Sequence, residues 1–279
     1  MLKIVLDSTG DLPEGWQEQY DIDIIPINII YNGKTYLQGI DMNYEDFYQL
    51  VENEGAVPST SQPTPYQFSE FYRRIAKPGD QILSIHVTEK LSGTMASAKI
   101  AAQELAGEYT IHAFDSASGT LVMGMMAKEA RVMDRAGKSI DQIVQRMKEI
   151  RSQHRLIFTL DTLKYASMSG RIKHLQAALA SLLHVKPIIE LRNGTLEMGE
   201  KVRSRKKSIE LLLNRLEKEF GEKRLIVGIA YARDKEAGTQ LMKDVIERFN
   251  CAEVILGEIS ISLAAHFGPG TLGVTAYPA

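Results

Sequence analysis

The sequence contains a single cysteine and lacks several features that mark secreted, membrane or nucleic-acid-binding proteins. Cys251 has no second cysteine to pair with, so an intrachain disulfide is impossible and a reducing compartment is expected. No apolar run approaches the length that spans a bilayer, and the strand-like start at Leu2–Leu6 shows no signal-peptide pattern. The net charge of -2 gives no electrostatic case for binding nucleic acid or an anionic membrane surface. These absences predict a cytoplasmic protein.

Complete signatures of metal and nucleotide chemistry are also missing. The 6 histidines are scattered, with no His-Glu-x-x-His and no Cys-x-x-Cys, so we expect no bound metal. Gly33-Lys34-Thr35 and Gly137-Lys138-Ser139 resemble the end of a phosphate-binding P-loop, but both lack its upstream glycine. Gly268–Gly273 has the glycine spacing of a dinucleotide-binding motif without the helix and strand that should follow it, so we expect a glycine turn there. We therefore expect no cofactor.

In the first half of the chain, apolar strand-like runs alternate with helical segments. Strands are expected at Leu2–Leu6, Ile24–Ile30, Ile82–Val87 and Thr110–Phe114. Helices are expected at Tyr44–Glu52, Pro65–Ile75, Thr94–Ala106, Leu121–Arg135 and Ile140–Arg151. The second of these helices has a well-defined start, because Thr64 can cap it, Pro65 fits its first position and Gln67 completes a capping box. The alternation predicts an α/β domain over residues 1–152, with a parallel sheet covered on both faces.

The second half combines hairpin-forming strands with long helices. Its strands are expected at Leu156–Leu160, Lys186–Leu191, Thr195–Met198, Leu225–Tyr231 and Val254–Ile259. The Asn193-Gly194 pair between two of these strands is a hairpin signal. The segment Ser208–Phe220 places apolar residues on one helical face, and Gly221 can end that helix. We expect an α+β domain over residues 153–279, with the change of domain near Ser152-Gln153-His154.

The stretch Leu91–Ala98 offers a binding site for an anion. It follows the strand-like run Gln81–Val87, and its Ser92-Gly93-Thr94 turn opens a helix of small residues. The first N–H groups of a helix lack intrahelical partners and, together with the helix dipole, favour an anion, which the glycine lets approach the backbone closely. An ordinary Ser/Thr cap is the alternative. A bound anion could be a phosphate, a reaction intermediate or the carboxylate of a fatty acid.

Other turns rich in small polar residues occur along the chain, and their order is informative. The motifs are DSTGDLP at residues 7–13, STSQPTP at 59–65, LSGT at 91–94, DS at 115–116, SGR at 169–171, KPII at 186–189 and HFGPGTLG at 266–273. Loops at the carboxyl ends of parallel strands are where open α/β sheets bind ligands. Together and in this order, the motifs resemble the DegV family of bacterial fatty-acid-binding proteins over essentially the whole chain. The family usually has Gly-Gly-Arg where this chain has Ser169-Gly170-Arg171.

The resemblance implies a ligand and the residues that hold it. It implies two α/β-containing domains with one long-chain fatty acid buried between them. The hydroxyls of Thr60 and Ser92 would bind the carboxylate of that fatty acid. Their neighbours Ser61 and Gly93 would contribute backbone groups. The remaining residues that the resemblance places near the head group are Arg171 and His266.

The resemblance also implies a carrier with no catalytic residue of its own. In the best understood members, the bound fatty acid is presented to a separate fatty acid kinase, which makes an acyl-phosphate for phospholipid synthesis. The partners of this chain would then be a long-chain fatty acid and a kinase subunit. Burial of the tail would contribute about 0.8 kcal/mol per methylene. Leu121–Met126 and Ala177–Leu183 are candidates for the apolar lining, with core packing as the alternative for any one of their residues.

Two enzymatic hypotheses stay open at this point. A small-molecule hydrolase would use Ser92 as nucleophile and His266 as base, although Lys90 stands where a nucleophile elbow requires glycine. A phosphoryl-transfer enzyme would gather Asp7, Asp115 and the Ser92 turn around Mg²⁺. The sequence completes the signature of neither enzyme.

Overall fold

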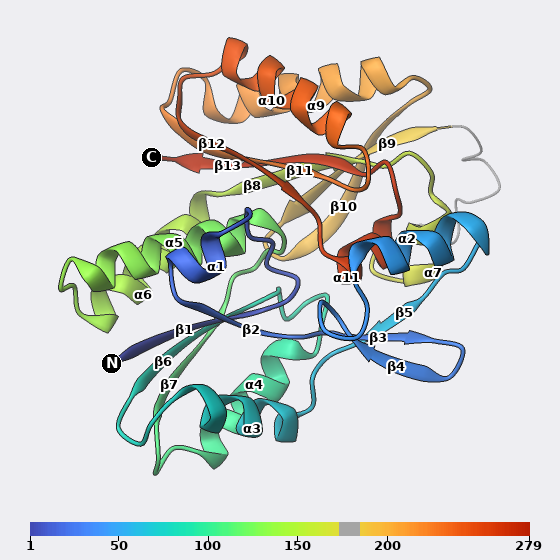
Figure 1. The fold of residues 1–279 in the computed structure, drawn as a ribbon. Coiled ribbons are helices and arrows are strands. Elements are labelled where there is room, and N and C mark those ends of the chain that lie inside the picture. Colours follow the sequence, from blue (N-terminus) through green and yellow to red (C-terminus); the bar gives the residue numbers. More distant parts are fainter. Residues whose placement is uncertain (173–184) are drawn as a thin grey trace.

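A four-stranded parallel sheet organises the first half of the chain in the computed structural model, which describes residues 1–172 and 185–279 (Figure 1). Its strands, in spatial order, are β2 (Ile22–Ile25), β1 (Leu2–Asp7), β6 (Gln81–His86) and β7 (Thr110–Asp115). The helices that cover it are α3 (Pro65–Ile75), α4 (Thr94–Glu104) and α5 (Leu121–Arg135). Val5 packs with α3 and α4 on one face, whereas Ile4 and Leu6 pack with α5 on the other. The predicted parallel sheet with two covered faces is confirmed.

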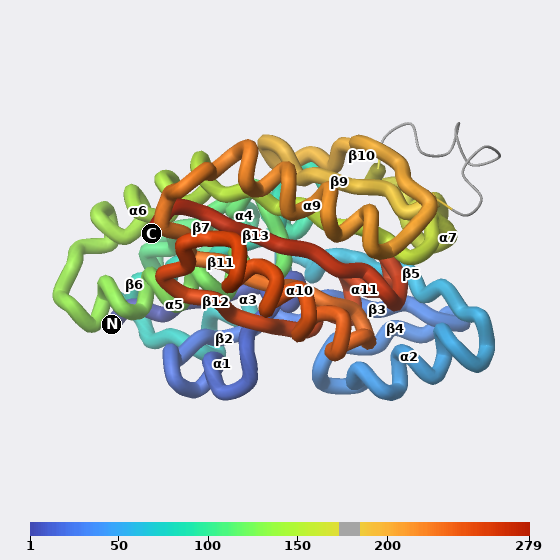
Figure 2. Tube along the Cα trace, turned by 90° about the horizontal axis from the view of Figure 1, so that it is seen from above, coloured from blue at the N-terminus to red at the C-terminus, as the bar shows by residue number. Residues whose placement is uncertain are grey.

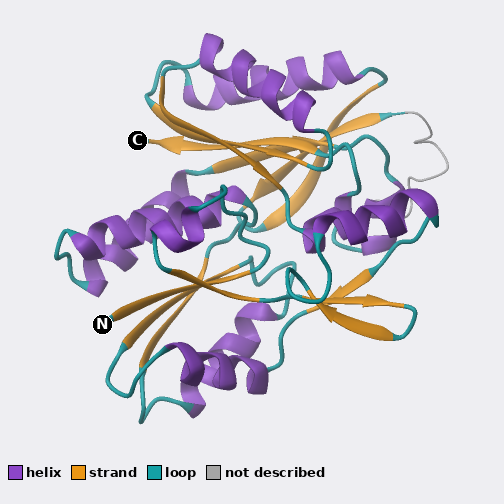
Figure 3. Ribbon diagram, in the orientation of Figure 1, coloured by secondary structure: helices purple, strands orange, loops and turns teal. Residues whose placement is uncertain are grey.

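A six-stranded mixed sheet organises the second half. Its strands, in spatial order, are β10 (Thr195–Val202), β9 (Lys186–Arg192), β8 (Arg155–Thr159), β13 (Leu272–Pro278), β11 (Leu225–Tyr231) and β12 (Cys251–Glu258). The β11–β12 pair is parallel and the other pairs are antiparallel. Helices α9 (Arg205–Phe220) and α10 (Lys235–Arg248) cover the outer face of this sheet, as the purple helices at the top of Figure 3 show. The expected α+β character of this half is confirmed.

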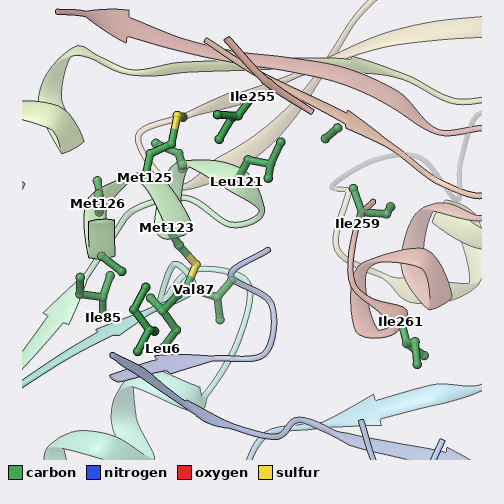
Figure 4. Close-up of a cluster of buried hydrophobic side chains, with 14 of the residues drawn as sticks. Leu6, Ile85, Val87, Leu121, Met123, Met125, Met126, Ile255, Ile259 and Ile261 are labelled. Atoms are coloured by element: carbon green, nitrogen blue, oxygen red, sulfur yellow. The ribbon is translucent and has the colours of Figure 1, made fainter. Parts of the chain in front are cut away.

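Helix α5 is buried between these two large sheets. Figure 4 shows Leu121 and Met125 directed toward Ile255 in the six-stranded sheet, while Met123 points toward Leu6 in the parallel sheet. Leu121 needs two glycines opposite it, because a Cβ at Gly228 or Gly257 would lie 3.1 or 2.7 Å from its side-chain atoms. The run Leu121–Met126 is therefore core packing, and the other candidate for an apolar lining, Ala177–Leu183, lies outside the described residues.

One local expectation was wrong, and a second was right only in part, because Gly268 and Gly270 do form a turn with φ of 79° and 77°. The strand expected at Ile24–Ile30 is interrupted at Pro26, which has no N–H to donate to a ladder, and its two ends belong to different sheets. After the break, Ile27 donates its N–H to Ser8 Oγ at 2.9 Å. The glycine turn expected at Gly268–Gly273 ends before Leu272, where β13 begins in the interior of the six-stranded sheet.

A small antiparallel sheet was not predicted. Its strands are β4 (Lys34–Leu37), β3 (Asn28–Tyr31) and β5 (Ser59–Ser61). Asn32 and Gly33 form the turn between β3 and β4 with φ of 49° and 72°, the left-handed conformation that an Asn-Gly hairpin requires. The same signal at Asn193-Gly194 did predict the β9–β10 hairpin, whose turn has φ of 49° and 78°.

The remaining helices complete the description. They are α1 (Trp16–Gln19), α2 (Tyr44–Asn53), α6 (Ile140–Gln153), α7 (Lys164–Ser169) and α11 (Ile261–Phe267). Of the described helices, α1, α7, α10 and α11 were not predicted. Across residues 1–172 and 185–279, none of the helices combines the length and hydrophobicity needed to cross a bilayer. The division into residues 1–152 and 153–279 falls at the end of α6 and stays a prediction.

The position of α5 predicts the effect of shortening Leu121, which is 0% exposed. Leu121→Ala removes the contacts of α5 with Gly228 and Gly257 in the six-stranded sheet, so the free energy of unfolding should fall by about 2–5 kcal/mol. Ile246→Ala is the matched control, because Ile246 is 53% exposed on α10 and should change stability by less than about 0.5 kcal/mol. Denaturant unfolding followed by circular dichroism measures both variants. Equal stabilities of the two variants would contradict the shared core.

Candidate functional site

A cavity lies where the carboxyl ends of β1, β6 and β7 face the six-stranded sheet. It holds about 1070 Å³ of empty space, counting the part that is open to solvent. Much of its wall is apolar and comes from strands of the six-stranded sheet and from α11. These apolar residues include Leu156, Phe158, Leu191, Leu196, Leu263 and Phe267. The volume and the apolar wall are those of a site for a small hydrophobic molecule.

The structure brings all of the predicted head-group residues to this cavity. Thr60 and Ser61 come from β5, Ser92 and Gly93 precede α4, Arg171 follows α7, and His266 belongs to α11. Figures 1 and 2 both place α11 beside β5, although more than 200 residues separate these elements in sequence. The family-like motifs therefore converge on one place. The assignment of these residues to a carboxylate stays a prediction.

Thr60 and His266 form a hydrogen-bonded pair in the cavity wall. The distance between Thr60 Oγ1 and His266 Nε2 is 2.9 Å. Burial, assisted by the charge of Arg171, lowers the pKa of His266 to about 3, so its imidazole is neutral at neutral pH. If Nε2 carries the proton, His266 donates to the threonine oxygen and leaves the threonine hydroxyl hydrogen available to a ligand. The pair can thus aim a donor into the cavity without burying a cation.

The Ser92 turn presents a second hydroxyl and an uncapped helix start. Ser92 Oγ lies 2.8 Å from Thr94 Oγ1 and accepts the Thr94 N–H at 3.3 Å. Gly93 is the N-cap residue of α4, so no side chain caps that helix. The Gln62 side chain crosses this turn, since a Cβ on Gly93 would lie 2.8 Å from Gln62 Nε2. Gln62 also lines the cavity and was not singled out in the sequence, although it stands within the motif at 59–65.

Arg171 is held at the cavity by its own turn. Its guanidinium donates to the Ser169 carbonyl oxygen at 2.6 Å, and its backbone N–H donates to Ser169 Oγ at 3.3 Å. Burial lowers the pKa of Arg171 from its usual range, but arginine stays cationic at neutral pH. Gly170 supplies the left-handed conformation with φ of 68°, while Ser169 is helical. A serine in place of the family's first glycine therefore fits this turn.

A buried chain of polar groups resembles a hydrolase triad but cannot reach a substrate. Asp7 Oδ2 lies 3.1 Å from His86 Nδ1, and His86 Nε2 lies 2.8 Å from Ser84 Oγ. All three side chains are 0% exposed. Asp7 also accepts the N–H groups of Thr9 at 3.0 Å and Val87 at 2.9 Å, and both of these residues line the cavity. The network fixes the cavity wall and leaves Asp7 no room for Mg²⁺.

The two enzymatic hypotheses lack their geometry in the structure. Ser92 is paired with Thr94, and His266 with Thr60, so no hydrogen bond joins the nucleophile of the hydrolase hypothesis to its base. Within the described residues, no group of three or more His, Cys, Asp or Glu side chains is placed to hold a metal ion. The phosphoryl-transfer hypothesis therefore has no magnesium site there.

A second buried carboxyl ties the cavity to α11. Asp11 accepts the Thr120 hydroxyl at 2.5 Å and the Ser260 N–H at 2.8 Å, and burial raises the pKa of Asp11 to about 7. Thr120 lines the cavity with φ of 56°, a strained conformation for a β-branched residue. Its N–H donates to the Thr9 carbonyl oxygen at 2.8 Å. These bonds hold the start of α5 against the segment that leads to His266.

The low pKa of His266 can be tested directly. In fatty-acid-free protein, the ring nitrogen shifts of His266 should stay those of a neutral imidazole from about pH 8 down to about pH 5, measured by NMR. Arg171→Ala should raise the pKa of His266, because the positive charge of Arg171 disfavours protonation. Titration of His266 near its ordinary value of 6.5 in the unmodified protein would contradict the burial of this pair.

Comparisons with known proteins agree over the whole chain. A family model described as "Uncharacterised protein, DegV family" matches residues 1–279. A DegV domain-containing protein of Deinococcus radiodurans is 32% identical over 99% of this chain and 98% of its own. The structure of a fatty-acid-binding DegV family protein from Thermus thermophilus matches with a TM-score of 0.89 and 32% identity, covering 100% of this chain and 99% of its own. DegV of Bacillus subtilis, a fatty acid binding protein, matches with a TM-score of 0.89, 27% identity and the same coverage. The chain therefore belongs to the DegV family.

Proposed function

We propose that this protein binds one long-chain fatty acid in the cavity, with the carboxylate at Thr60 and Ser92 and the tail along the apolar wall. The observation that carries the proposal is the convergence of polar groups from separate segments in a cavity that is otherwise largely apolar. The fatty acid binding of the similar proteins from Thermus thermophilus and Bacillus subtilis supports it. The ligand would lie between the domains proposed at residues 1–152 and 153–279.

The head-group end of the cavity offers hydrogen-bond donors to a carboxylate. The hydroxyl of Thr60, oriented by His266, and the hydroxyl of Ser92 each donate one hydrogen bond to a carboxylate oxygen. Ser61 adds backbone groups from β5, and Gly93 adds its own at the start of α4, where the helix dipole favours a negative charge. Arg171 supplies the positive charge that a carboxylate in a partly buried site requires.

The apolar end meets the second requirement, which is removal of the tail from water. Leu156 and Phe158 of β8, with Leu191 and Leu196 of the neighbouring hairpin, present a continuous apolar wall. At about 0.8 kcal/mol per methylene, a tail of roughly fifteen carbons contributes on the order of 10 kcal/mol before ordering costs. Tail burial therefore supplies most of the affinity, and the polar groups set the orientation.

We also propose that the protein is a carrier for a partner fatty acid kinase in the cytoplasm. A carboxylate oxygen of the bound acid would attack the terminal phosphorus of ATP held by the kinase. The new P–O bond forms as the bond to the leaving ADP breaks, giving an acyl-phosphate for phospholipid synthesis. Hydroxyls and a neutral histidine support this role, because they hold the carboxylate without themselves acting as nucleophiles. The chain would need no cofactor of its own.

Protein produced in bacteria should carry its ligand. Denaturing organic extraction followed by mass spectrometry should release close to one equivalent of long-chain fatty acid, because tail burial makes release slow. The same preparation should show no turnover of ester substrates. Robust esterase activity that is abolished by His266→Ala would favour the hydrolase hypothesis over the carrier. Protein that is reproducibly empty and also fails to take up added fatty acid would refute fatty-acid binding.

The carboxylate assignment predicts the effect of removing two hydroxyls. Thr60→Ala and Ser92→Ala each delete a hydrogen bond to a charged acceptor, worth roughly 1.5–3 kcal/mol, so each should weaken fatty-acid binding by about 10- to 100-fold. Thr60→Ser keeps the hydroxyl and should bind within about threefold of the unmodified protein. Calorimetry on delipidated protein measures the affinities, and circular dichroism checks the fold. Unchanged affinity in the double variant Thr60→Ala, Ser92→Ala would exclude the assignment.

A further inference from the structure

A surface depression adjoins the head-group end of the cavity. It is lined by Lys90, Leu91, Ser169, Gly170, Arg171 and Thr195. Leu91 and Arg171 also line the cavity, so these two side chains separate the two spaces. The depression thus begins where the proposed carboxylate site ends, on the side that faces solvent.

The depression is positively charged. Among the residues that the structure describes, its lining includes two cations, Lys90 and Arg171, and no acidic residue. None of the ion pairs found within residues 1–172 and 185–279 includes either of these cations. Lys99 and Lys186, in contrast, are paired with Glu89 and Asp161. Two cations without a carboxylate partner favour an anion from outside the chain.

The position of Lys90 is defined by the β9–β10 hairpin. The Thr88 hydroxyl donates to the Gly194 carbonyl oxygen at 3.1 Å, and the Lys90 N–H donates to Thr88 Oγ1 at 3.4 Å. The lysine stem runs over the hairpin turn, since a Cβ on Gly194 would lie 3.5 Å from Lys90 Cδ. The hairpin therefore brings Thr195 and the lysine to the same side of the depression.

We propose that this depression binds the phosphate group of an acyl-phosphate while its acyl chain stays in the cavity. This inference rests on the proposed function. A phosphate attached to the carboxyl group must extend beyond the carboxylate site, and the depression is the adjoining space with positive charge. A phosphate group carries about -1.5 to -2 charges near pH 7, against -1 for a carboxylate. Arg171 alone can balance the substrate, whereas Lys90 adds the charge that the product requires.

Two probes of equal acyl length separate the subsites. Hexadecanoic acid occupies the cavity alone, whereas 2-oxoheptadecylphosphonate, the stable methylene analogue of the acyl-phosphate, also presents a phosphorus group. Lys90→Met, which keeps the apolar stem, should weaken binding of the phosphonate about tenfold and that of hexadecanoic acid less than about twofold. Lys90→Arg should restore the phosphonate affinity. Lys243→Met, at an exposed position on α10, is the matched control and should alter neither affinity. Calorimetry on delipidated protein at constant ionic strength gives both constants.

The outcomes distinguish this inference from the function on which it rests. Equal loss for both probes in Lys90→Met would place the lysine on the carboxylate, and no loss for either probe would exclude the phosphate subsite. In both cases the unmodified protein would still bind hexadecanoic acid, so the proposed function would stand. Failure of the unmodified protein to bind hexadecanoic acid would instead overturn the proposed function and the phosphate subsite together.

Discussion

The packing of helix α5 against both large sheets is the constraint on which the rest of the molecule depends. Leu121 reaches the six-stranded sheet only because Gly228 and Gly257 have no side chains, and Met123 on the same helix packs against the parallel sheet. Protein interiors are close-packed, so a helix that packs against two sheets fixes the distance between those sheets. Thr120 stands at the start of this helix and lines the cavity. The dimensions of the cavity are therefore set by the core.

The polar groups of the cavity are arranged to avoid uncompensated buried charge. His266 is neutral because it is buried near Arg171, and Asp7 is surrounded by backbone N–H groups and His86. Removing an unpaired ion from water costs several kcal/mol. Burying a hydroxyl or a neutral imidazole ring costs much less. This explains why threonine, serine and histidine, rather than lysine, accompany a single arginine at this end.

Local signals account for the parts of the fold that the sequence predicted. The helix Pro65–Ile75 begins as expected because Thr64 and Gln67 exchange both capping-box hydrogen bonds. By contrast, β13 contains Gly273, which weakens a strand signal, yet β13 pairs with β8 and β11. Glycine is required at this position because a Cβ there would collide with Phe158. Pairing between segments that are far apart in sequence cannot be predicted from a short stretch of residues.

The polar residues of the site were predicted from the sequence, but its apolar wall was not. The motifs identified the hydroxyls, the arginine and the histidine through the family resemblance, and the structure gathers all of them at one cavity. Leu121–Met126 was a candidate for the apolar wall, with core packing as the alternative, and its residues belong to the core, whereas Leu156 and Leu196 line the cavity. Apolar residues facing a cavity and apolar residues facing a core have the same periodicity, so only tertiary structure separates them.

The order of strands in the six-stranded sheet has a consequence for biosynthesis. β13 occupies an interior position between β8 and β11, although it follows both of them in sequence. During translation, β8 and β11 leave the ribosome before residues 272–278. The strand that pairs with both of them is therefore not yet present. The Thr60–His266 contact likewise spans 206 positions, so it can form only after residue 266 has been synthesised. The incomplete sheet is thus the stage of synthesis at which a chaperone would be of most use.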